Sequence, residues 1–160
     1  MTYRETTHIL PLVVRAVEND EQWEQARSIR HQVFVIEQAC DPEEEWDVHD
    51  DRSRHLIGYA ENVPVAVSRW RTVAYRKKAV AKLERFAVLA EYRGLSYGRS
   101  MVRATIDDAR RAGFDDFLIH AQEHLVGFYT DFGFEPVGDV FIEAGIRHRV
   151  MHRLSPTSKS

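Results

Sequence analysis

The sequence predicts one mixed α/β domain, in which helices flank a central mixed, mostly antiparallel sheet and so form three layers. The 160 residues suffice for one domain with a substantial core. Strand-like segments come first, then alternate with helical segments, and return at the end of the chain. The length and this order of elements predict the fold class over residues 1–160.

Composition and charge exclude several classes of protein. Apolar residues make up 44% of the chain and charged residues 29%, as in ordinary globular domains. The net charge of −3 gives no basic footprint, so we expect no nucleic-acid partner. No apolar run reaches the length of a membrane span and the first residues lack a signal-peptide core, so we expect a cytoplasmic protein without a membrane partner. The single cysteine, Cys40, excludes an internal disulfide.

The first part of the chain predicts a strand followed by an amphipathic helix. After an expected flexible tail at 1–10, residues 11–17 are rich in β-branched side chains and predict a strand. Asn19 offers an N-cap, and apolar residues recur at helical spacing over 21–38. We expect the apolar face of this helix to lie in the core.

The segment 41–54 is rich in acids, and we expect it to be a surface loop because Pro42 breaks helices. Two interpretations of its charge are open. The carboxylates could attract a cationic amine, or they could form a solvated face without a ligand.

A three-stranded meander is predicted next, followed by alternating elements. The strands at 55–60 and 63–71 are joined by the turn at 61–62, which favours an antiparallel hairpin. A basic turn at 74–78 leads into a third strand at 79–89. The later predicted elements are a helix at 101–112 that Gly113 ends, a strand at 114–121, a short helix at 125–132, strand-like residues at 134–137 and 140–142, a last strand at 147–154 and a flexible tail at 155–160.

The loop between the strand at 79–89 and the next helix has the chemistry of a phosphate site. Backbone N–H groups are free at the start of a helix, where the helix dipole is positive. Anions bind readily at such a position. The glycines Gly94 and Gly98 could equally serve a tight turn, so local chemistry alone leaves both interpretations open.

Two motifs, one in this loop and one some thirty residues later, carry a resemblance to a known family. The run Arg93-Gly94-Leu95-Ser96-Tyr97-Gly98 resembles the pyrophosphate loop of the GNAT acyltransferases, and residues 128–134 resemble their Phe-Tyr-x-x-x-Gly-Phe motif. Residues 29–38 and 145–148 look like the small ElaA-like branch of that superfamily. Ser96 stands where the loop motif prefers glycine, and we expect this serine to adopt an ordinary φ.

The resemblance implies an acyl-CoA-dependent N-acyltransferase that transfers acetyl from acetyl-CoA to a primary amine. The acceptor is expected to be a small molecule, no metal is expected, and a homodimer is left open. The pantetheine arm is expected to pair with the backbone of the strand at 79–89, and Gln122 falls where the family usually has asparagine. The cofactor residues that the resemblance implies are Phe86, Ala87, Val88, Arg93, Gly94, Leu95, Ser96, Tyr97, Gly98, Arg99 and Gln122.

Tyr129 and Glu84 are the candidate catalytic residues. Tyr129 matches the family's tyrosine that protonates the departing thiolate, although it could be a core aromatic only. Glu84 is the only carboxylate in the strand at 79–89 and lies, by period-two counting, on the face of Phe86 and Val88. It could be the general base or an ion-pair partner. The alternatives to Glu84 as base are His120, His124, His148 and a water relay.

The sequence also bears on a metal site, on a function without catalysis and on the position of the acceptor. His148 and His152 are four residues apart on a strand, which is too far for one metal ion. A non-catalytic acyl-CoA-binding or regulatory module is the alternative function, and Ser96 favours it. The resemblance implies that the acceptor enters between residues 43–47 and 143–148. The carboxylates there predict a negative rim, so we expect an amine with an additional positive charge.

Overall fold

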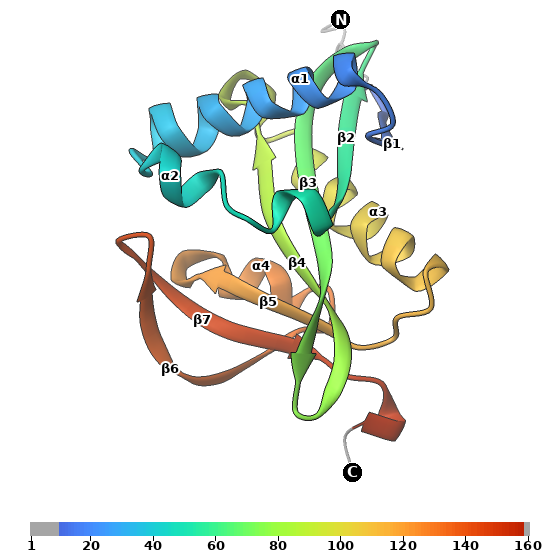
Figure 1. Ribbon diagram of the computed structural model, residues 1–160, viewed down its shortest axis with the longest axis vertical. Helices are drawn as coiled ribbons and strands as arrows, with labels where there is room; N and C mark the ends of the chain where they lie inside the picture. Colours follow the sequence, from blue (N-terminus) through green and yellow to red (C-terminus); the bar gives the residue numbers. More distant parts are fainter. Residues whose placement is uncertain (1–9, 159–160) are drawn as a thin grey trace, which may run out of the picture.

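A seven-stranded mixed sheet forms the middle layer, which confirms the predicted fold class (Figure 1). The computed structural model describes residues 10–158; the predicted tail residues 1–9 and 159–160 lie outside that range. Within it, the strands run in the order β1-β2-β3-β4-β5-β7-β6, and only β4 and β5 pair in parallel. The elements are β1 Leu12–Ala16, α1 Asp20–Arg30, a π-helix His31–Glu37, α2 Pro42–Glu45, β2 Arg54–Ala60, β3 Val63–Tyr75, β4 Lys78–Val88, α3 Tyr97–Arg111, β5 Phe117–Gln122, α4 Val126–Thr130, β6 Glu135–Glu143 and β7 Ile146–Arg153, with 3₁₀ turns at Asp50–Arg52, Ala90–Tyr92, Glu123–Leu125 and Pro156–Ser158.

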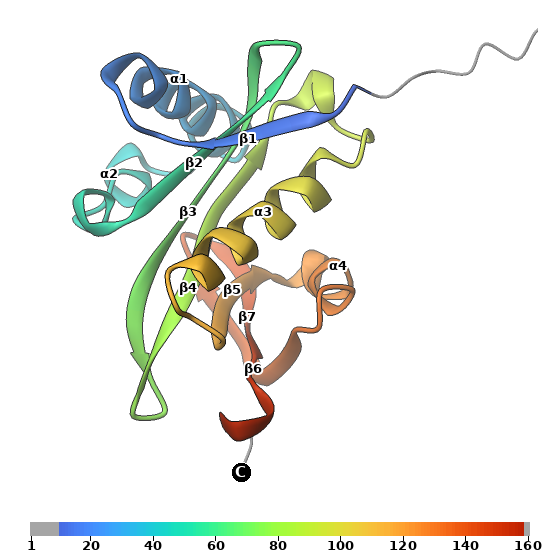
Figure 2. The same ribbon diagram turned by 90° about the vertical axis from the view of Figure 1, so that its right-hand side faces the viewer.

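Helices cover both faces of the sheet: α1 and α2 lie on one face, and α3 and α4 lie on the other (Figure 2). On the α3 face, Leu83 packs with Val102 and Ile106. On the α1 face, Ile29 packs with Val67. α1 and α3 therefore bury the apolar stripes that their sequence periods predicted.

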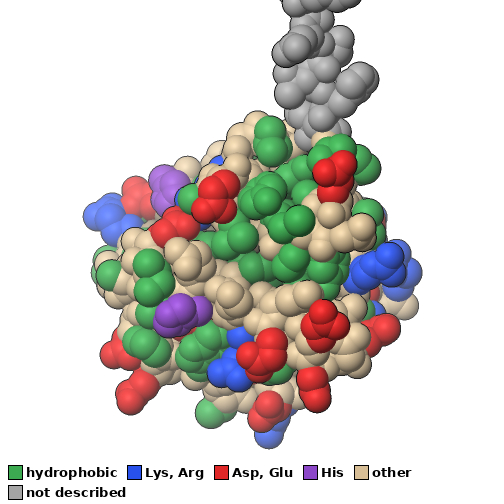
Figure 3. Space-filling view, turned by 90° about the horizontal axis from the view of Figure 1, so that it is seen from above, with side chains coloured by type: hydrophobic (Ala, Val, Ile, Leu, Met, Phe, Trp, Pro, Cys, Tyr) green, Lys and Arg blue, Asp and Glu red, His purple; other side chains and the backbone are tan. Residues whose placement is uncertain are grey.

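The upper end of the molecule carries a gathering of hydrophobic side chains, with charged side chains around it (Figure 3). None of the helices in residues 10–158 has the length and apolar composition needed to cross a membrane. The predicted C-terminal tail is ordered at its start, because the Ser155 amide donates to Asp116 Oδ1 at 2.7 Å.

The helix predicted at 21–38 changes character part-way. Asn19 is its N-cap, as predicted, and its side chain accepts a hydrogen bond from the Gln22 amide at 2.8 Å. The α-helical part ends at Arg30, and the chain continues as a π-helix over His31–Glu37. A π-helical segment is uncommon and often lies at a functional site.

The prediction of a loop without a helix at 41–54 is wrong. Pro42 occupies the first turn of α2, where its missing N–H costs nothing, and Asp41 caps this helix by accepting from the Glu43 amide at 2.9 Å. Proline breaks a helix in its interior but favours a helix start.

β4 and β5 separate half-way along β4. Their pairing runs from Ala81 opposite Phe117 to Leu83 opposite Ile119, whereas β4 continues to Val88. In Figure 1, β5, β7 and β6 turn away from the direction of β4 beyond this point. The second half of β4 therefore has an edge that β5 does not cover.

A β-bulge at Arg85 changes which way β4 side chains point. Val67 pairs with Ala87 and Arg69 pairs with Glu84, so two β4 residues oppose Ser68 alone. Arg85 has a φ of 57°, in the left-handed region. The extra residue breaks the period of two, so the face predicted for Glu84 is wrong.

Packing shows the new arrangement of faces. Glu84 points to the α1 face, where it pairs with Arg69, whereas Phe86 packs against the α3-face cores. Ala87 returns to the α1 face and packs with Ile29. Phe86 and Val88 thus share a face, and Glu84 lies on the opposite one.

α3 begins at Tyr97, four residues before the predicted start, so Gly98 and Arg99 lie in its first turn. Ser96 is its N-cap residue and has a φ of 66°, which contradicts the expected ordinary φ. Its side chain makes no capping hydrogen bond. The first-turn amides, which have no intrahelical partner, are therefore not satisfied by this residue.

Candidate active site

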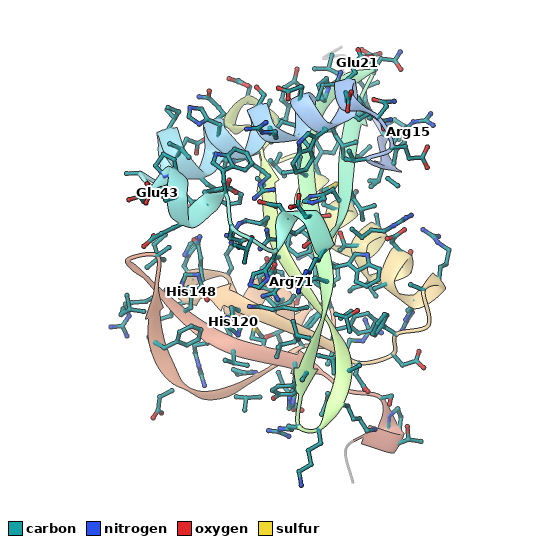
Figure 4. The ribbon with its side chains drawn as sticks, viewed as in Figure 1. Arg15, Glu21, Glu43, Arg71, His120 and His148 are labelled. Carbon is teal, nitrogen blue, oxygen red and sulfur yellow. The ribbon has the colours of Figure 1, made fainter. Side chains whose placement is uncertain are left out.

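A pocket of about 510 Å³ opens where β4 and β5 separate. Arg71, His120 and His148 lie close together in its interior, and Glu43 lies at its edge on α2 (Figure 4). Arg15 and Glu21, by contrast, lie at the far end of the molecule. The pocket is lined by Phe34, Gln38, Cys40, Glu43, Glu44, Glu45, Asp47, His49, Arg69, Arg71, Lys82, Leu83, Glu84, Arg85, Phe86, Ile119, His120, Gln122, Leu125, Tyr129, Glu143, Ala144, Ile146 and His148.

One wall of the pocket is an ion-pair network, which we call the inner arginine cluster. Arg30 is 2% exposed and pairs with Glu45 at 2.8 Å and with Asp50 at 2.6 Å. Glu45 is also buried, and Trp46 stacks on the Arg30 guanidinium. The members of the cluster are Arg30, Arg69 and Arg85 with Glu45, Asp47 and Asp50.

The cluster explains what the acid-rich segment does. Arg69 pairs with Asp47 and Asp50, both at 2.8 Å, and Arg85 pairs with Asp47 at 3.3 Å. Burial would raise the pKa of Asp47, but hydrogen bonds and attraction from Arg69 hold it well below its usual range. Three of the acids in 41–54 therefore point inward and are neutralised, so this part is neither a solvated face nor a free attractant for a cation.

Glu84 belongs to a second group of ion pairs. It pairs with Arg69 at 2.7 Å and with Arg71 and Lys82, both at 3.1 Å. Burial would raise its pKa, but the hydrogen bonds of Arg71 and the charges of Arg69 and Lys82 lower it to about 2. A carboxylate with this pKa has little tendency to take a proton near neutral pH. The ion-pair interpretation of Glu84 is thus the one with geometric support.

His120 and Glu143 form a pair on the opposite wall. His120 Nδ1 lies 3.1 Å from Glu143 Oε1, and this contact lowers the pKa of the Glu143 carboxyl. A carboxylate beside Nδ1 favours the tautomer that carries its proton there and leaves the Nε2 lone pair free. His148 lies nearby, with Nε2 3.8 Å from Glu143, and its Nδ1 contacts the Ile146 carbonyl.

Tyr129 is 5% exposed yet lines the pocket. Its ring packs among Phe86, Phe128 and Phe134, at centroid distances of 6.1, 5.1 and 6.3 Å. Burial raises the pKa of its phenol, so Tyr129 keeps its proton throughout the neutral range. The residue is therefore both a core aromatic and a proton holder at the pocket.

The loop residues 93–99, which we call the cofactor loop, lie at the start of α3. Arg93 donates to the Val88 carbonyl at 3.0 Å and pairs with Glu37. Arg99 pairs with Asp131 at 2.6 Å and lies over the Phe128 ring. Both predicted phosphate-binding arginines are exposed, and both have carboxylate partners in this structure.

Of the predicted cofactor residues, only Phe86 and Gln122 line the pocket; the others lie outside its lining. Tyr97 is buried and its hydroxyl donates to the Leu10 carbonyl at 2.9 Å, so only its backbone faces outward. Leu95 packs against the same core as Tyr97. Gln122, at the end of β5, lines the pocket and donates to Gln38 at 3.2 Å.

The glycines of the cofactor loop leave room that the protein does not use. A Cβ at Gly98 would meet only Phe128 Cζ, at an ordinary 3.8 Å, and φ at Gly98 is not positive. Neither packing nor backbone conformation within residues 10–158 therefore requires a glycine here. Gly94 differs, because its φ of 79° favours glycine.

A family model described as the acetyltransferase (GNAT) domain matches residues 17–155. The chain belongs to the GNAT acetyltransferase family. Its GNAT relatives include the uncharacterized N-acetyltransferase YjcF of Bacillus subtilis, 35% identical over 134 residues, which span 83% of this chain and 93% of YjcF. The protein ElaA of Escherichia coli is 33% identical over 128 residues, covering 78% of this chain and 82% of ElaA. The predicted family and branch are thereby confirmed.

Solved structures agree with this GNAT assignment. The crystal structure of E. coli ElaA has a TM-score of 0.77 and covers 89% of this chain and 99% of ElaA, at 27% identity. An acyl-CoA N-acyltransferase from Pseudomonas aeruginosa has a TM-score of 0.77 at 26% identity, covering 90% of this chain and 99% of that one.

The GNAT motifs led to the cofactor loop and Tyr129 but not to the charged walls. Arg30 and Arg85 line or support the pocket and were not predicted as site residues, and Glu143 was predicted only as part of the stretch 143–148 that flanks the acceptor. One signal was available, because charged residues such as Arg69 interrupt an otherwise buried strand. The described residues contain no group of three or more His, Cys, Asp or Glu able to hold a metal ion.

Proposed function

We propose that this GNAT chain is an acyl-CoA-dependent N-acyltransferase that transfers acetyl from acetyl-CoA to a primary amine. The observation that carries the proposal is the separation of β4 from β5 beyond Leu83, beside the start of α3. The backbone of β4 beyond Leu83 is therefore not paired with β5, the first turn of α3 is not capped by Ser96, and the pocket at this separation contains Phe86 and Tyr129. An extended arm ending in pyrophosphate matches such a surface, because strand edges and helix starts bind these two chemistries.

The cofactor loop fits the pyrophosphate. The unused space at Gly98 and the uncapped first turn of α3 support binding there through backbone N–H groups. Arg93 and Arg99 would add charge by exchanging their exposed carboxylate partners for phosphate. The other proposed cofactor contacts are the backbone of Phe86, Ala87 and Val88, the loop residues Gly94, Leu95, Ser96 and Tyr97, and the side chain of Gln122.

The reaction requires one bond to form and one to break. The acceptor nitrogen bonds to the thioester carbonyl carbon, the C–S bond breaks, the nitrogen loses a proton and the thiolate gains one. When bound, acetyl-CoA supplies the activated acyl group. Tyr129 is proposed to give its proton to the thiolate, since burial keeps the phenol protonated until a strong base forms beside it.

We propose that His120 takes the proton from the amine, directly or through one water. Glu143 holds Nδ1, so Nε2 is left as the acceptor, and His120 lines the pocket. Glu84 stays a prediction as base, and its pairing with three cations argues for a structural role. His120 and Tyr129, which both line the pocket, would thus divide the two proton transfers of the reaction.

Acetyl-CoA consumption with a panel of amines, polyamines, amino sugars and peptides tests the proposal. We expect turnover with at least one amine, and calorimetry should show coenzyme A binding. Binding of coenzyme A without turnover of any acceptor would favour the non-catalytic acyl-CoA-binding module instead. A chain that neither binds coenzyme A nor consumes acetyl-CoA would overturn both functions.

A further inference from the structure

The charges around the pocket are unevenly compensated. In the inner arginine cluster, three arginines meet three carboxylates, so this wall carries no surplus. Its pairing is also dense, since both Arg30 and Arg69 contact more than one carboxylate. The surplus charge lies on the neighbouring floor of the pocket, formed by β3 and β4.

The floor has two cations for one carboxylate. Arg71 and Lys82 both pair with Glu84, whose second oxygen already accepts from Arg69. Arg71 uses Nε and Nη2 for Glu84, and its Nη1 makes no hydrogen bond with residues 10–158. The two side chains are only 17% and 12% exposed, yet both line the pocket.

The other carboxylates of the pocket do not remove this surplus. The hydrogen bond of His120 and, more weakly, the charge of Lys82 lower the pKa of Glu143. Its direct contacts are with His120 and His148, and its side chain is 46% exposed, so it offsets the charge of Lys82 only from a distance and through solvent screening. Glu43 and Glu44 lie on α2 at the rim, and both are exposed. The pocket therefore has a positive floor at Arg71 and Lys82 and a negative rim at Glu43 and Glu44. Figure 4 labels Arg71 on β3 and Glu43 on α2.

We propose that the amine acceptor also carries a carboxylate, as an amino acid does, and that Arg71 and Lys82 bind this carboxylate. This inference rests on the proposed function, because it names the acceptor of the same site. A carboxylate on the floor would bring the local charges to two cations and two anions. Poorly hydrated, part-buried cations gain more from such a charge-assisted contact than exposed ones.

The acid-rich segment predicted an acceptor with an additional positive charge, whereas the floor of the pocket favours an acceptor with a carboxylate. An additional cation on the acceptor would meet Glu43, Glu44 and Glu143, whose carboxylates are all exposed to solvent screening. A carboxylate would meet two shielded cations with donors to spare. The substrate class with the better-matched partner in this pocket is a zwitterionic or anionic amine.

Matched acceptors test the inference directly. We would compare KM for the L-amino acids and for their carboxamides, with acetyl-CoA as donor. For at least one pair, the acid should have a KM about tenfold lower than the amide, which corresponds to one charge-assisted contact. Arg71→Gln and Lys82→Gln should raise KM for the acid about tenfold and leave KM for the amide within about twofold.

Controls separate binding from folding. Lys77→Gln, in the turn after β3 and outside the pocket lining, should change neither KM. In the Lys82→Gln variant, Glu84 keeps its two arginine partners, so the melting temperature of this variant should stay near that of the parent. Lys82→Gln therefore still tests the inference if Arg71→Gln does not fold. Arg71→Lys should restore part of the affinity for the acid, because it returns the charge.

Other outcomes would overturn the inference. If amides react as well as acids, or if the variants raise both KM values equally, the carboxylate does not bind at Arg71 and Lys82 while the acyltransferase function stands. If no acceptor in the panel reacts, the site is tested by calorimetric titration of N-acetylglycine and N-acetylglycinamide into the protein–coenzyme A complex. Equal or absent binding of the two would then overturn the inference.

Discussion

The cofactor side and the acceptor side of the pocket are built from different groups. On the cofactor side, the candidate contacts are backbone groups of β4 and of the cofactor loop, and the loop arginines lie on the surface. On the acceptor side, buried charged side chains pair with one another. The cofactor side should therefore tolerate lost side chains but not added atoms, whereas the acceptor side should lose stability when a fully buried charge such as Arg30 is removed.

Removing a buried charge gives the largest expected change in stability. Arg30→Met keeps most of the volume but leaves the buried Glu45 with only the longer contact to Arg85 and Asp50 with only Arg69, so the free energy of unfolding should fall by about 3–5 kcal/mol. Arg27→Met, which breaks an exposed pair with Glu24 on the same helix, should cost less than about 1 kcal/mol. Urea denaturation measures both. Similar small losses would mean that the inner arginine cluster behaves like a surface network.

The Tyr129 hydroxyl joins the two sides. Tyr129→Phe keeps the ring packing with Phe86 and removes only the proton, so kcat should fall about a hundredfold with a competent acceptor. Affinity for coenzyme A should stay near normal by calorimetry. Phe128→Leu, which changes a neighbouring ring, serves as the control for packing. A Tyr129→Phe variant with the parent's kcat would leave Tyr129 as a core aromatic only.

A fall in pH should lower the free energy of unfolding through protonation of Glu84, on the acceptor side. Its pKa in the folded protein, about 2, is below the ordinary 4.5, so its stabilising effect is complete above pH 4.5 and is lost as the pH falls toward 2. The loss should be on the order of 1–3 kcal/mol. Urea midpoints at falling pH measure it. Glu84→Gln should be less stable at neutral pH and should lack this part of the acid dependence; an unchanged slope would contradict the assignment.

Adding a methyl group tests the cofactor side. Gly98→Ala should weaken coenzyme A binding on the order of tenfold, because the Cβ takes space beside the helix start. The same change should leave stability equal or raise it by up to about 1 kcal/mol, since alanine favours helices. Gly98→Trp should reduce affinity far more. Unchanged affinity in the tryptophan variant would remove the cofactor from this loop.

The smallest expected effect concerns the strained serine. Ser96→Gly removes the cost of a left-handed φ and should raise the free energy of unfolding by up to about 1 kcal/mol. Ser100→Gly, inside the first turn of α3, should lower it by a similar amount. Chemical denaturation compares the two. A loss of stability in Ser96→Gly would show that the serine side chain contributes more than its backbone costs.

The cofactor side could be predicted because its chemistry is local in sequence. A strand, a glycine-bearing loop and a helix start follow one another within 78–111, and together they fix where backbone N–H groups are free. Asn19 as N-cap and the hairpin turn at 61–62 were predicted for the same reason. Such features depend on residues that are neighbours along the chain.

Only the tertiary structure decided the acceptor side. A single extra residue at Arg85 reversed the face expected for Glu84, and no local pattern marks such a bulge. Three acids of 41–54, Glu45, Asp47 and Asp50, are neutralised by arginines from α1, β3 and β4, which meet only when the chain folds. Whether a charge is solvated or paired depends on what packs against it, so sequence determined the charges of this protein and the fold determined their partners.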